Sequence, residues 1–549
     1  MRNLEQIRDF RVLDRDIADF DRMISSRGKY EETLFIASDA NRALAIAQAG
    51  ALTKRISSLP TGDPVFEVLA GHFRDYIDDV MHWLDGSNDN IGQKAHSISW
   101  WLYSLCKMDY RPEDVRARVF ASKLKHIPMW WNDGLLPLVA VATPSKLRDV
   151  LFGLNQVLIV AEDIRPDLEA SFGRFAGVYA IDALLGQFIE TIRDYVTHVG
   201  KLIESKGGVP NTQARADGDT VNKTHDEYRA VLTNRVGVDL DEVLEWYESE
   251  NEKTRAEQLE LALRLDLSVK SAADVSKMLF QHAGPCDNPK EMFERGNSYL
   301  QRARAAAHDY IWLPEDEVCE ITEVPKHLKD SYPWGGYNAD YPSCYPLYNV
   351  MFLNNYNYNN VTDGWLKLQS LHEAYPGHHA QFLRCAIDPI PETMKRGAKS
   401  TAFTEGVCIR TERTFEYVFP EDPYYPLMVA HRRHHTSTRI KVDLWLNYFG
   451  KTIGEACDLY EKEMGFDRKT ARAQVQAHES MFGYFTGYYY GVKKLEDWEK
   501  QYKWAPKEYT KLLFSVGRPS LDTFEKILML SPEDRHSLLH DFASMMQFA

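Results

Sequence analysis

The sequence LHEAYPGHHAQ, residues 371–381, places three histidines and one glutamate within eight residues, from His372 to His379. A zinc hydrolase uses neutral imidazoles as metal ligands and a carboxylate that accepts a proton from the attacking water. A His-Glu pair followed by a further histidine on the same helix supplies both groups. The stretch therefore predicts a metal-dependent hydrolase with Glu373 as its general base.

Pro376 occupies the position, four residues after His372, where the common spacing would place the second histidine. Proline cannot bind a metal, and it disrupts a helix because it lacks a backbone N–H. Together with Gly377 it predicts a kink or a bulge, which would bring a later histidine to the place of the second ligand. We favour His378 as this ligand with His379 as its neighbour, and the sequence leaves the reverse assignment open.

A third ligand is expected from residues 401–419, TAFTEGVCIRTERTFEYVF, because catalytic zinc commonly takes two histidines and one glutamate. Glu405 lies 27 residues after His378, which leaves room for a turn and an antiparallel helix. We take Glu405 as the third ligand. Glu412, seven residues later on the same helical face, is taken as a carboxylate that orients a ligand histidine. Solvated surface charges are the alternative for both glutamates.

Residues 431–435, HRRHH, form with Arg439 a strongly basic patch in an acidic chain. Arginine forks bind carboxylates and phosphates. Helical periodicity places Arg432, His435 and Arg439 on a common side. Arg432 and Arg439 could therefore bind the C-terminus of a substrate, as in a carboxypeptidase or a dipeptidase. A solvated helix face, or a set of salt-bridge partners for the excess acidic residues, is the alternative.

The motif H-E-x-x-P-G-H-H-x-Q, followed about thirty residues on by a Glu-Gly pair and by a second Glu seven residues later, resembles the bacterial domain of unknown function 885. That family is placed near the gluzincin-type zinc metallopeptidases, whose ligands are two histidines and a glutamate. The resemblance covers residues 226–495. It implies a mostly helical body with a gluzincin-like active-site core, Glu373 as the base, and three metal ligands: His372, His378 and Glu405.

Three positions depart from the pattern of this family. Val407 follows Glu405-Gly406 where the family has Trp, Asn447 stands where the family tends to have His, and Phe482-Gly483-Tyr484 replaces Pro-Gly-Gln. The expected ligands are intact, so these changes affect substrate choice and the groups that stabilise an oxyanion. We take Tyr488 as the oxyanion donor and include Asn447 among the substrate-binding residues.

Helical patterns dominate the rest of the chain, including single long helices over 171–205 and 468–494. The expected fold is mainly α, a large multi-helix body with a small β-sheet next to the metal-binding helix. Residues 348–354, YNVMFLN, are the best strand candidate. Such a sheet can hold an extended substrate through main-chain hydrogen bonds, and an ordinary connection is the alternative.

The polar segment 207–224, GGVPNTQARADGDTVNKT, is the strongest internal break. It predicts an N-terminal helical region over 1–206, a loop or hinge over 207–224, and a catalytic metallopeptidase-like region over 225–549. A single continuous body is the alternative.

The composition excludes several classes of function. A formal net charge of -15 argues against nucleic acid and against an anionic membrane surface as partners. The N-terminus is charged throughout and lacks the apolar core of a signal peptide. Seven cysteines are scattered without a C-x-x-C pair, which is typical of reduced thiols. We therefore expect a cytoplasmic protein.

The sequence as a whole favours a metallohydrolase that binds one Zn²⁺, with another divalent metal as an alternative, and that acts on short peptides or peptide-like amides. Two alternatives remain: a hydrolase of non-peptide amides, and a metal-binding or ligand-binding protein that has lost turnover on the same fold. The oligomeric state cannot be predicted.

Overall fold

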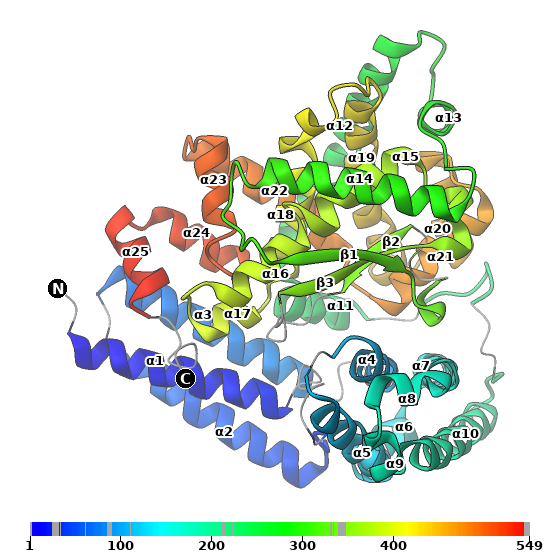
Figure 1. The fold of residues 1–549 in the computed structure, drawn as a ribbon, viewed down its shortest axis with the longest axis vertical. Helices are drawn as coiled ribbons and strands as arrows, with labels where there is room; N and C mark the ends of the chain where they lie inside the picture. Colours follow the sequence, from blue (N-terminus) through cyan, green and yellow to red (C-terminus); the bar gives the residue numbers. More distant parts are fainter. Residues whose placement is uncertain are drawn as a thin grey trace. The chain divides into compact units, whose positions relative to one another are not determined.

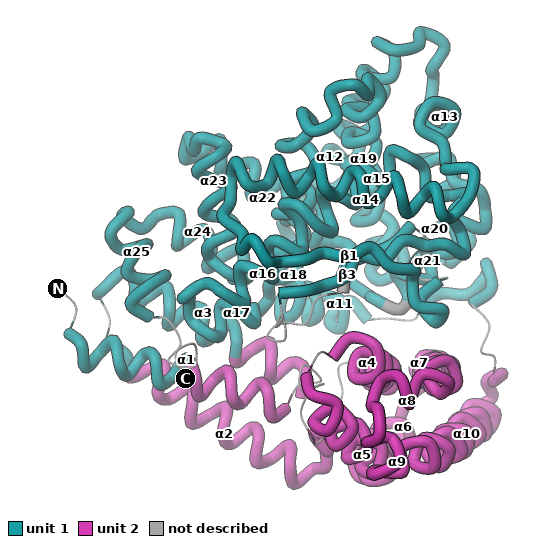
Figure 2. Tube along the Cα trace, viewed as in Figure 1, with its two compact units in different colours: residues 1–14, 59–76, 215–549 teal, residues 15–58, 77–214 magenta. Residues whose placement is uncertain are grey.

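The computed structural model describes residues 3–24, 32, 34–60, 62–84, 91–109, 111–210, 215–221, 224–329, 332, 334–338 and 347–542. The chain forms two compact units (Figures 1 and 2). Unit 1 comprises Met1–Asp14, Leu59–Tyr76 and Arg215–Ala549, and unit 2 comprises Arg15–Ser58 and Ile77–Ala214. The predicted break at 207–224 contains the last of these boundaries, whereas residues 1–14 and 59–76 group with the C-terminal part of the chain.

Helices α1 (Leu4–Ile24) and α3 (Pro64–Leu84) contribute residues to both units. The other helices of unit 2 are α2 (Asp39–Ser57), α4 (Ile91–Lys107), α5 (Glu113–Met129), α6 (Leu136–Val141), α7 (Pro144–Ile164), α8 (Leu168–Phe172), α9 (Phe175–Val178) and α10 (Ile181–Ser205). The apolar faces of α4 to α10 meet in one buried core of aliphatic and aromatic side chains. The single helix predicted over 171–205 is wrong, because Gly173 and Ala180 adopt φ values of 52° and 50° that no helix accommodates.

Unit 1 carries the remaining helices and all strands of the described residues. The helices are α11 (His225–Val231), α12 (Leu240–Leu265), α13 (Ala272–His282), α14 (Pro289–Ala307), α15 (Asp363–Gln369), α16 (His378–Ile387), α17 (Glu392–Arg396), α18 (Thr401–Thr414), α19 (Tyr425–Asn447), α20 (Ile453–Met464), α21 (Arg468–Ser480), α22 (Thr486–Gln501), α23 (Pro506–Leu513), α24 (Leu521–Met529) and α25 (Pro532–His540). The mainly helical fold is thus confirmed. The single helix predicted over 468–494 is wrong, because the chain breaks at Gly483 between α21 and α22.

A three-stranded sheet lies in unit 1 (Figure 1). Its strands are β1 (Val318–Glu323), β2 (Gly335–Asn338) and β3 (Tyr348–Leu353), in the order β1-β3-β2. Strand β3 pairs in parallel with β1 and antiparallel with β2. The strand predicted at 348–354 is confirmed as β3. It is the central strand of the sheet and is mostly buried. The edge strand β2 was not predicted, because two of its four residues are glycines, which weaken a strand pattern.

Helices α18 and α22 pack backbone to backbone. A Cβ atom added at Gly406 on α18 would lie 2.5 Å from the carbonyl carbon of Gly491 on α22, and one added at Gly491 would lie 1.8 Å from the carbonyl oxygen of Ala402. No side chain fits in either place. The Glu-Gly pair at 405–406 therefore brings Glu405 directly beside the start of α22.

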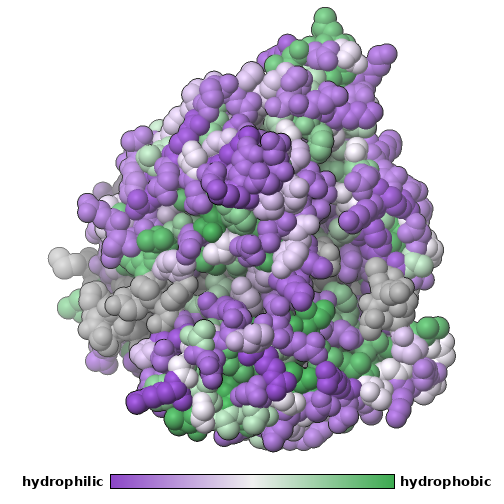
Figure 3. All heavy atoms as spheres, turned by 45° about the vertical axis from the view of Figure 1, so that its right-hand side comes forward, coloured by the Kyte–Doolittle hydropathy of each residue, from purple (hydrophilic) through white to green (hydrophobic). Residues whose placement is uncertain are grey.

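On the face shown in Figure 3, hydrophilic residues predominate and hydrophobic residues lie between them. Among the described residues, no helix has both the length and the apolar character needed to cross a bilayer.

Candidate functional site

The helix that carries the histidine motif is interrupted, as the sequence predicts. After α15 the chain forms a π-helical turn, Ser370–Ala374, in which the Tyr375 N–H donates to the Ser370 carbonyl at 2.9 Å. Tyr375 is extended, and α16 begins at His378. A Cβ atom at Gly377 would lie 1.9 Å from the carbonyl oxygen of His372, so this tight turn requires glycine.

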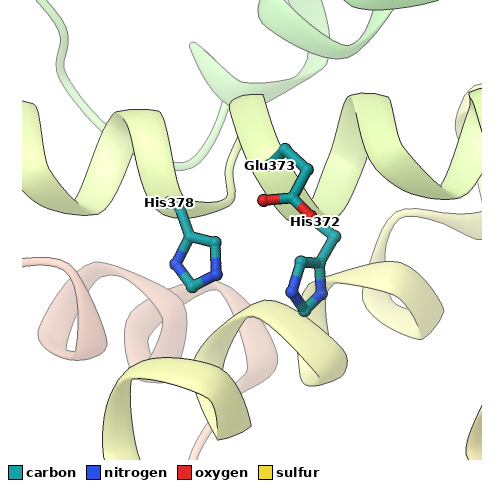
Figure 4. A group of neighbouring side chains, drawn as sticks. All are labelled: His372, Glu373 and His378. Atoms are coloured by element: carbon teal, nitrogen blue, oxygen red, sulfur yellow. The ribbon is translucent and has the colours of Figure 1, made fainter. Parts of the chain in front are cut away.

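This interruption brings His372 and His378 to the same side of the helix (Figure 4). Their ring centres are 4.9 Å apart, and the ring planes are nearly perpendicular, at 89°. The Nε2 atoms of both rings lie 3.4 Å from the same oxygen, Oε2 of Glu405 on α18. That oxygen is buried and accepts no hydrogen bond.

These three side chains fit a zinc ion. Imidazole nitrogens lie about 2.0–2.1 Å from zinc, so two ligand atoms of a tetrahedral site lie about 3.3 Å apart. The observed nitrogen–oxygen separation is 3.4 Å for both histidines. An ion would also satisfy the buried Glu405 oxygen, which is costly to leave without a partner. The donor set of two imidazoles and one carboxylate is therefore suited to hold this metal.

Glu373 faces the same space. His372, Glu373 and His378 each offer one atom that can bind a metal, and these three atoms all lie within 4.8 Å of one another. Two carboxylates thus lie close to the histidine pair. Glu405 is the better candidate ligand because one of its oxygens is equally close to both Nε2 atoms. Glu373 is half-buried beside them, where it can exchange a proton with a bound water.

The Nδ1 atoms of the two histidines have protein partners. Nδ1–H of His372 donates to Oε1 of Glu412 at 2.8 Å, the orienting contact that the sequence predicts for this glutamate. Nδ1 of His378 is hydrogen-bonded to the Cys408 sulfur at 3.3 Å. Cys408 was not predicted as a site residue, although it lies three residues after Glu405 and thus on a similar face of α18. Both rings are oriented with Nε2 toward Glu405.

The charges of the site perturb its titration. Burial acts to raise the pKa of Glu405, but the imidazoles of His378 and His372 outweigh it and hold this pKa well below its usual range. Burial acts to lower the pKa of His372, but the neighbouring carboxylates of Glu405 and Glu412 raise it to about 9. The metal-free site thus favours positive charge at His372, opposite the anionic Glu405.

His379, the alternative ligand, points away from the pair. Its Nε2–H donates to Oε2 of Glu317 at 2.6 Å, and its Nδ1 accepts from the Tyr337 hydroxyl at 3.1 Å. Both ring nitrogens are occupied, and the side chain is fully buried. The structure therefore places His378, and not His379, beside His372 and Glu405.

Two tyrosines from the start of α22 and the loop before it complete the site. The Tyr484 hydroxyl donates a short hydrogen bond to Oε1 of Glu405, and the Tyr488 hydroxyl lies 3.4 Å from that of Tyr484. Burial raises the pKa of both hydroxyls well above the usual value, so both keep their protons. Tyr484 was not predicted as a site residue, and Gly483, which breaks the helix before it, is the signal that could have indicated it.

A cavity of about 160 Å³ is lined by His372, Glu373, His378, Glu405, Glu412, Tyr484 and Tyr488. Cys408, His379 and Glu317 do not line it. Its walls include edge strand β2 and two buried arginines of α19, Arg432 and Arg439. The solvated helix face considered for these arginines is therefore wrong. Asn447 does not line the cavity: its side-chain N–H groups donate to the carbonyl and carboxylate oxygens of Asp443. Asn447, predicted to bind substrate, therefore lies outside the cavity lining, and its N–H groups are used within α19.

The family described as "Bacterial protein of unknown function (DUF885)" matches residues 39–527. No curated protein matches the chain. Several solved structures share its fold, including the following two. One is described as a "putative lipoprotein from Colwellia psychrerythraea", with a TM-score of 0.76 at 13% identity over 96% of this chain and 99% of that chain. The other is a "putative lipoprotein of unknown function from Shewanella oneidensis", with a TM-score of 0.69 at 13% identity over 96% and 100%.

Proposed function

This chain belongs to the bacterial DUF885 family, whose description assigns no activity, and we propose from its site that it is a zinc-dependent hydrolase of short peptides or peptide-like amides. The observation that carries the proposal is the placement of two imidazole Nε2 atoms, each 3.4 Å from one unpartnered oxygen of Glu405. The arrangement corresponds to the two-histidine, one-glutamate set of gluzincin-type peptidases.

His372, His378 and Glu405 would hold the ion, for which another divalent metal is an alternative to zinc. When bound, the ion would polarise the substrate carbonyl and make a water more acidic. Glu373 would take a proton from the attacking water and pass it to the leaving amine. The protonated Tyr488 and Tyr484 hydroxyls are candidates to donate hydrogen bonds to the oxyanion, although both contact Glu405 or each other in the present geometry.

The edge strand β2 supports peptides over other amides. Among the described residues, β2 pairs only with β3, and residues 335–337 line the cavity. An extended peptide could add to this edge by main-chain hydrogen bonds, which a small non-peptide amide cannot form. A hydrolase of non-peptide amides therefore remains the second candidate.

The test combines metal analysis with a peptide-library cleavage screen, with and without chelator. We expect one zinc per chain, cleavage that chelator abolishes, and a loss of turnover of about 10²- to 10⁴-fold in Glu373→Gln. This variant should still bind zinc, since Glu373 is the proposed base and not a ligand. Full activity of Glu373→Gln would refute the mechanism. Absence of stoichiometric metal would favour a binding protein that has lost turnover.

The proposal includes a cytoplasmic location and a small peptide or amide as the partner, with neither nucleic acid nor membrane. The scattered cysteines are the argument for the location, and the six described ones are free thiols. Both structural relatives carry the description "putative lipoprotein". Recovery of the native protein in the membrane fraction of its cells would contradict the cytoplasmic assignment.

A further inference from the structure

We propose that Arg432 and Arg439 form a carboxylate-binding subsite, so that the substrates are short peptides with a free C-terminal carboxylate. This inference rests on the proposed function, because it places the scissile amide at the candidate metal ligands. It names a substrate class that those ligands alone do not define.

The two arginines are built into the cavity wall. Both side chains lie on α19, both are only 7% exposed, and both line the cavity that contains His372, His378 and Glu405. Burying a guanidinium group is costly unless an anion pairs with it. Their place at the cavity surface therefore requires a compensating negative charge.

The protein supplies only part of that charge. Among the described residues, no carboxylate forms an ion pair with Arg439, its amide partner Gln474 lies at 3.2 Å, and its Nε–H has no acceptor. Arg432 lies 3.5 Å from Oε1 of Glu412, an oxygen that already accepts from His372 at 2.8 Å. The Arg439 guanidinium thus has no carboxylate partner, and the Arg432 guanidinium shares the Glu412 carboxylate with His372.

The charge balance of the cavity also favours an anion. Its charged lining consists of three carboxylates, Glu373, Glu405 and Glu412, and the two guanidinium groups. A bound divalent cation would give the site one excess positive charge. A substrate carboxylate would neutralise that charge, and an arginine fork binds a carboxylate with two parallel hydrogen bonds.

Aromatic rings hold both guanidinium groups in place. The Arg439 guanidinium lies over the rings of Phe485, at 4.5 Å, and Tyr488, at 5.2 Å. The Arg432 guanidinium lies over Trp365, at 5.5 Å, and Tyr488, at 5.6 Å. Such stacking leaves the N–H edges of a guanidinium group free to bind an anion in the ring plane.

Tyr488 also sets the distance from this subsite to the candidate metal ligands. Its ring is nearly parallel to that of His372, with the ring centres 6.1 Å apart, and both guanidinium groups lie over the same ring, at 5.6 Å for Arg432 and 5.2 Å for Arg439. An extended peptide advances about 3.3–3.6 Å per residue. One to three residues would therefore span from the scissile amide to the guanidinium groups, which fits a carboxypeptidase or a dipeptidase.

The test compares N-acetylated dipeptides carrying each of the common residues at the C-terminus, prepared both as free acids and as C-terminal amides. Binding is measured by calorimetry on metal-loaded and metal-free protein, and cleavage is measured on the metal-loaded protein. We expect the best acid to bind about 100-fold more tightly than its amide, since truncating a buried charged pair costs this much. In Arg439→Met and in Arg432→Met, the preference should fall close to one.

Arg433→Met is the matched control. Arg433 is a buried arginine of the same helix, but it pairs with Glu496 at 2.6 Å and does not line the cavity. We expect this variant to keep the preference for acids, and Arg439→Lys to keep only part of it, because lysine retains the charge and loses the fork. Circular dichroism and the zinc content would show that each variant is folded.

The outcomes separate this inference from the proposed function. Equal binding and cleavage of acids and amides by a zinc-loaded enzyme would overturn the subsite and leave the hydrolase intact. Preferential binding of acids by a protein that takes up no zinc and cleaves nothing would support the subsite and refute the hydrolase. Failure of every acid to bind either form would overturn the subsite.

Discussion

The adjacent residues His378 and His379 belong to two different clusters of polar side chains. The His378 cluster comprises His372, His378, Glu405 and Glu412, and the His379 cluster comprises His379, Glu317, Arg304, Tyr375 and Tyr337. Each cluster contains histidine and carboxylate and lies in unit 1, and the histidines and glutamates of both clusters are buried. They differ in whether their hydrogen bonds are complete.

The carboxylate of the His379 cluster is fully occupied. Oε2 of Glu317 accepts from the His379 Nε2–H and from the Tyr375 hydroxyl, both at 2.6 Å, and Oε1 accepts from Arg304 at 2.5 Å. In the His378 cluster, Oε2 of Glu405 accepts nothing, although it is buried. A closed network rigidifies a fold, whereas an open acceptor between two Nε2 atoms can receive an ion. The difference indicates that composition alone does not identify a metal site.

The largest effect is expected from exchanging one histidine for alanine in each cluster. Loss of a group that only hydrogen-bonds to a ligand weakens metal binding by a factor of about 10 to 100. His378→Ala should weaken zinc binding by more than this factor, because it removes a ligand itself. His379→Ala should bind zinc with nearly unchanged affinity per folded molecule. Competition titration against a chromophoric chelator measures both affinities. An equal decrease in zinc affinity in the two variants would contradict the assignment of the metal site to the His378 cluster alone.

The next effect concerns stability. Glu317→Gln removes the charge that pairs with Arg304 and His379, and a broken buried pair leaves its partner uncompensated. We expect it to lower the free energy of unfolding by about 3 kcal/mol, the lower end of this effect, because the Arg304 side chain is partly exposed. Urea denaturation of the metal-free protein measures this loss. The folded fraction should keep full zinc binding. A variant as stable as the wild type would mean that the His379 cluster is not a structural network.

A smaller effect on zinc binding is expected at Glu412, which accepts a hydrogen bond from the proposed ligand His372 and is not itself a proposed ligand. Glu412→Gln should weaken zinc binding by about 10- to 100-fold, because His372 loses the carboxylate that orients its ring. The same titration measures it, with His379→Ala as the reference. A decrease as large as that of His378→Ala would indicate that Glu412 binds the metal itself.

The smallest effect is the pH dependence of the His379 cluster. Burial acts to raise the pKa of Glu317, but His379, Tyr375 and Arg304 outweigh it and keep this pKa below the usual value of 4.5. A lowered folded-state pKa contributes stability above pH 4.5, and this contribution is lost as the pH falls through the folded-state pKa. The stability difference between wild type and Glu317→Gln should therefore shrink below pH 4.5. Denaturation of the metal-free proteins from pH 3.5 to 7 tests this, and a constant difference would contradict it.

Local sequence signals were sufficient for the helical fold and for the interruption of the motif helix. Proline and glycine act on their own backbone, so Pro376 and Gly377 indicate the break without knowledge of the rest of the chain. The strand β3 is an apolar β-prone run and was equally clear. The long helices over 171–205 and 468–494 were overestimated, because positive φ at Ala180 and Gly483 depends on packing around the turn.

The sequence by itself determined the types of residue that the site would need: the histidines, Glu373, and Glu405 with Gly406 beside it. Only the tertiary structure decided which histidine faces His372. Successive residues of a helix point about 100° apart, so the choice depends on where α16 begins and on which neighbour captures the other ring. Glu317, 62 residues before His379 in the chain, forms that hydrogen bond, and Tyr484 reaches Glu405 across 79 residues. Contacts over such separations depend on how the helices pack, and no local pattern encodes them.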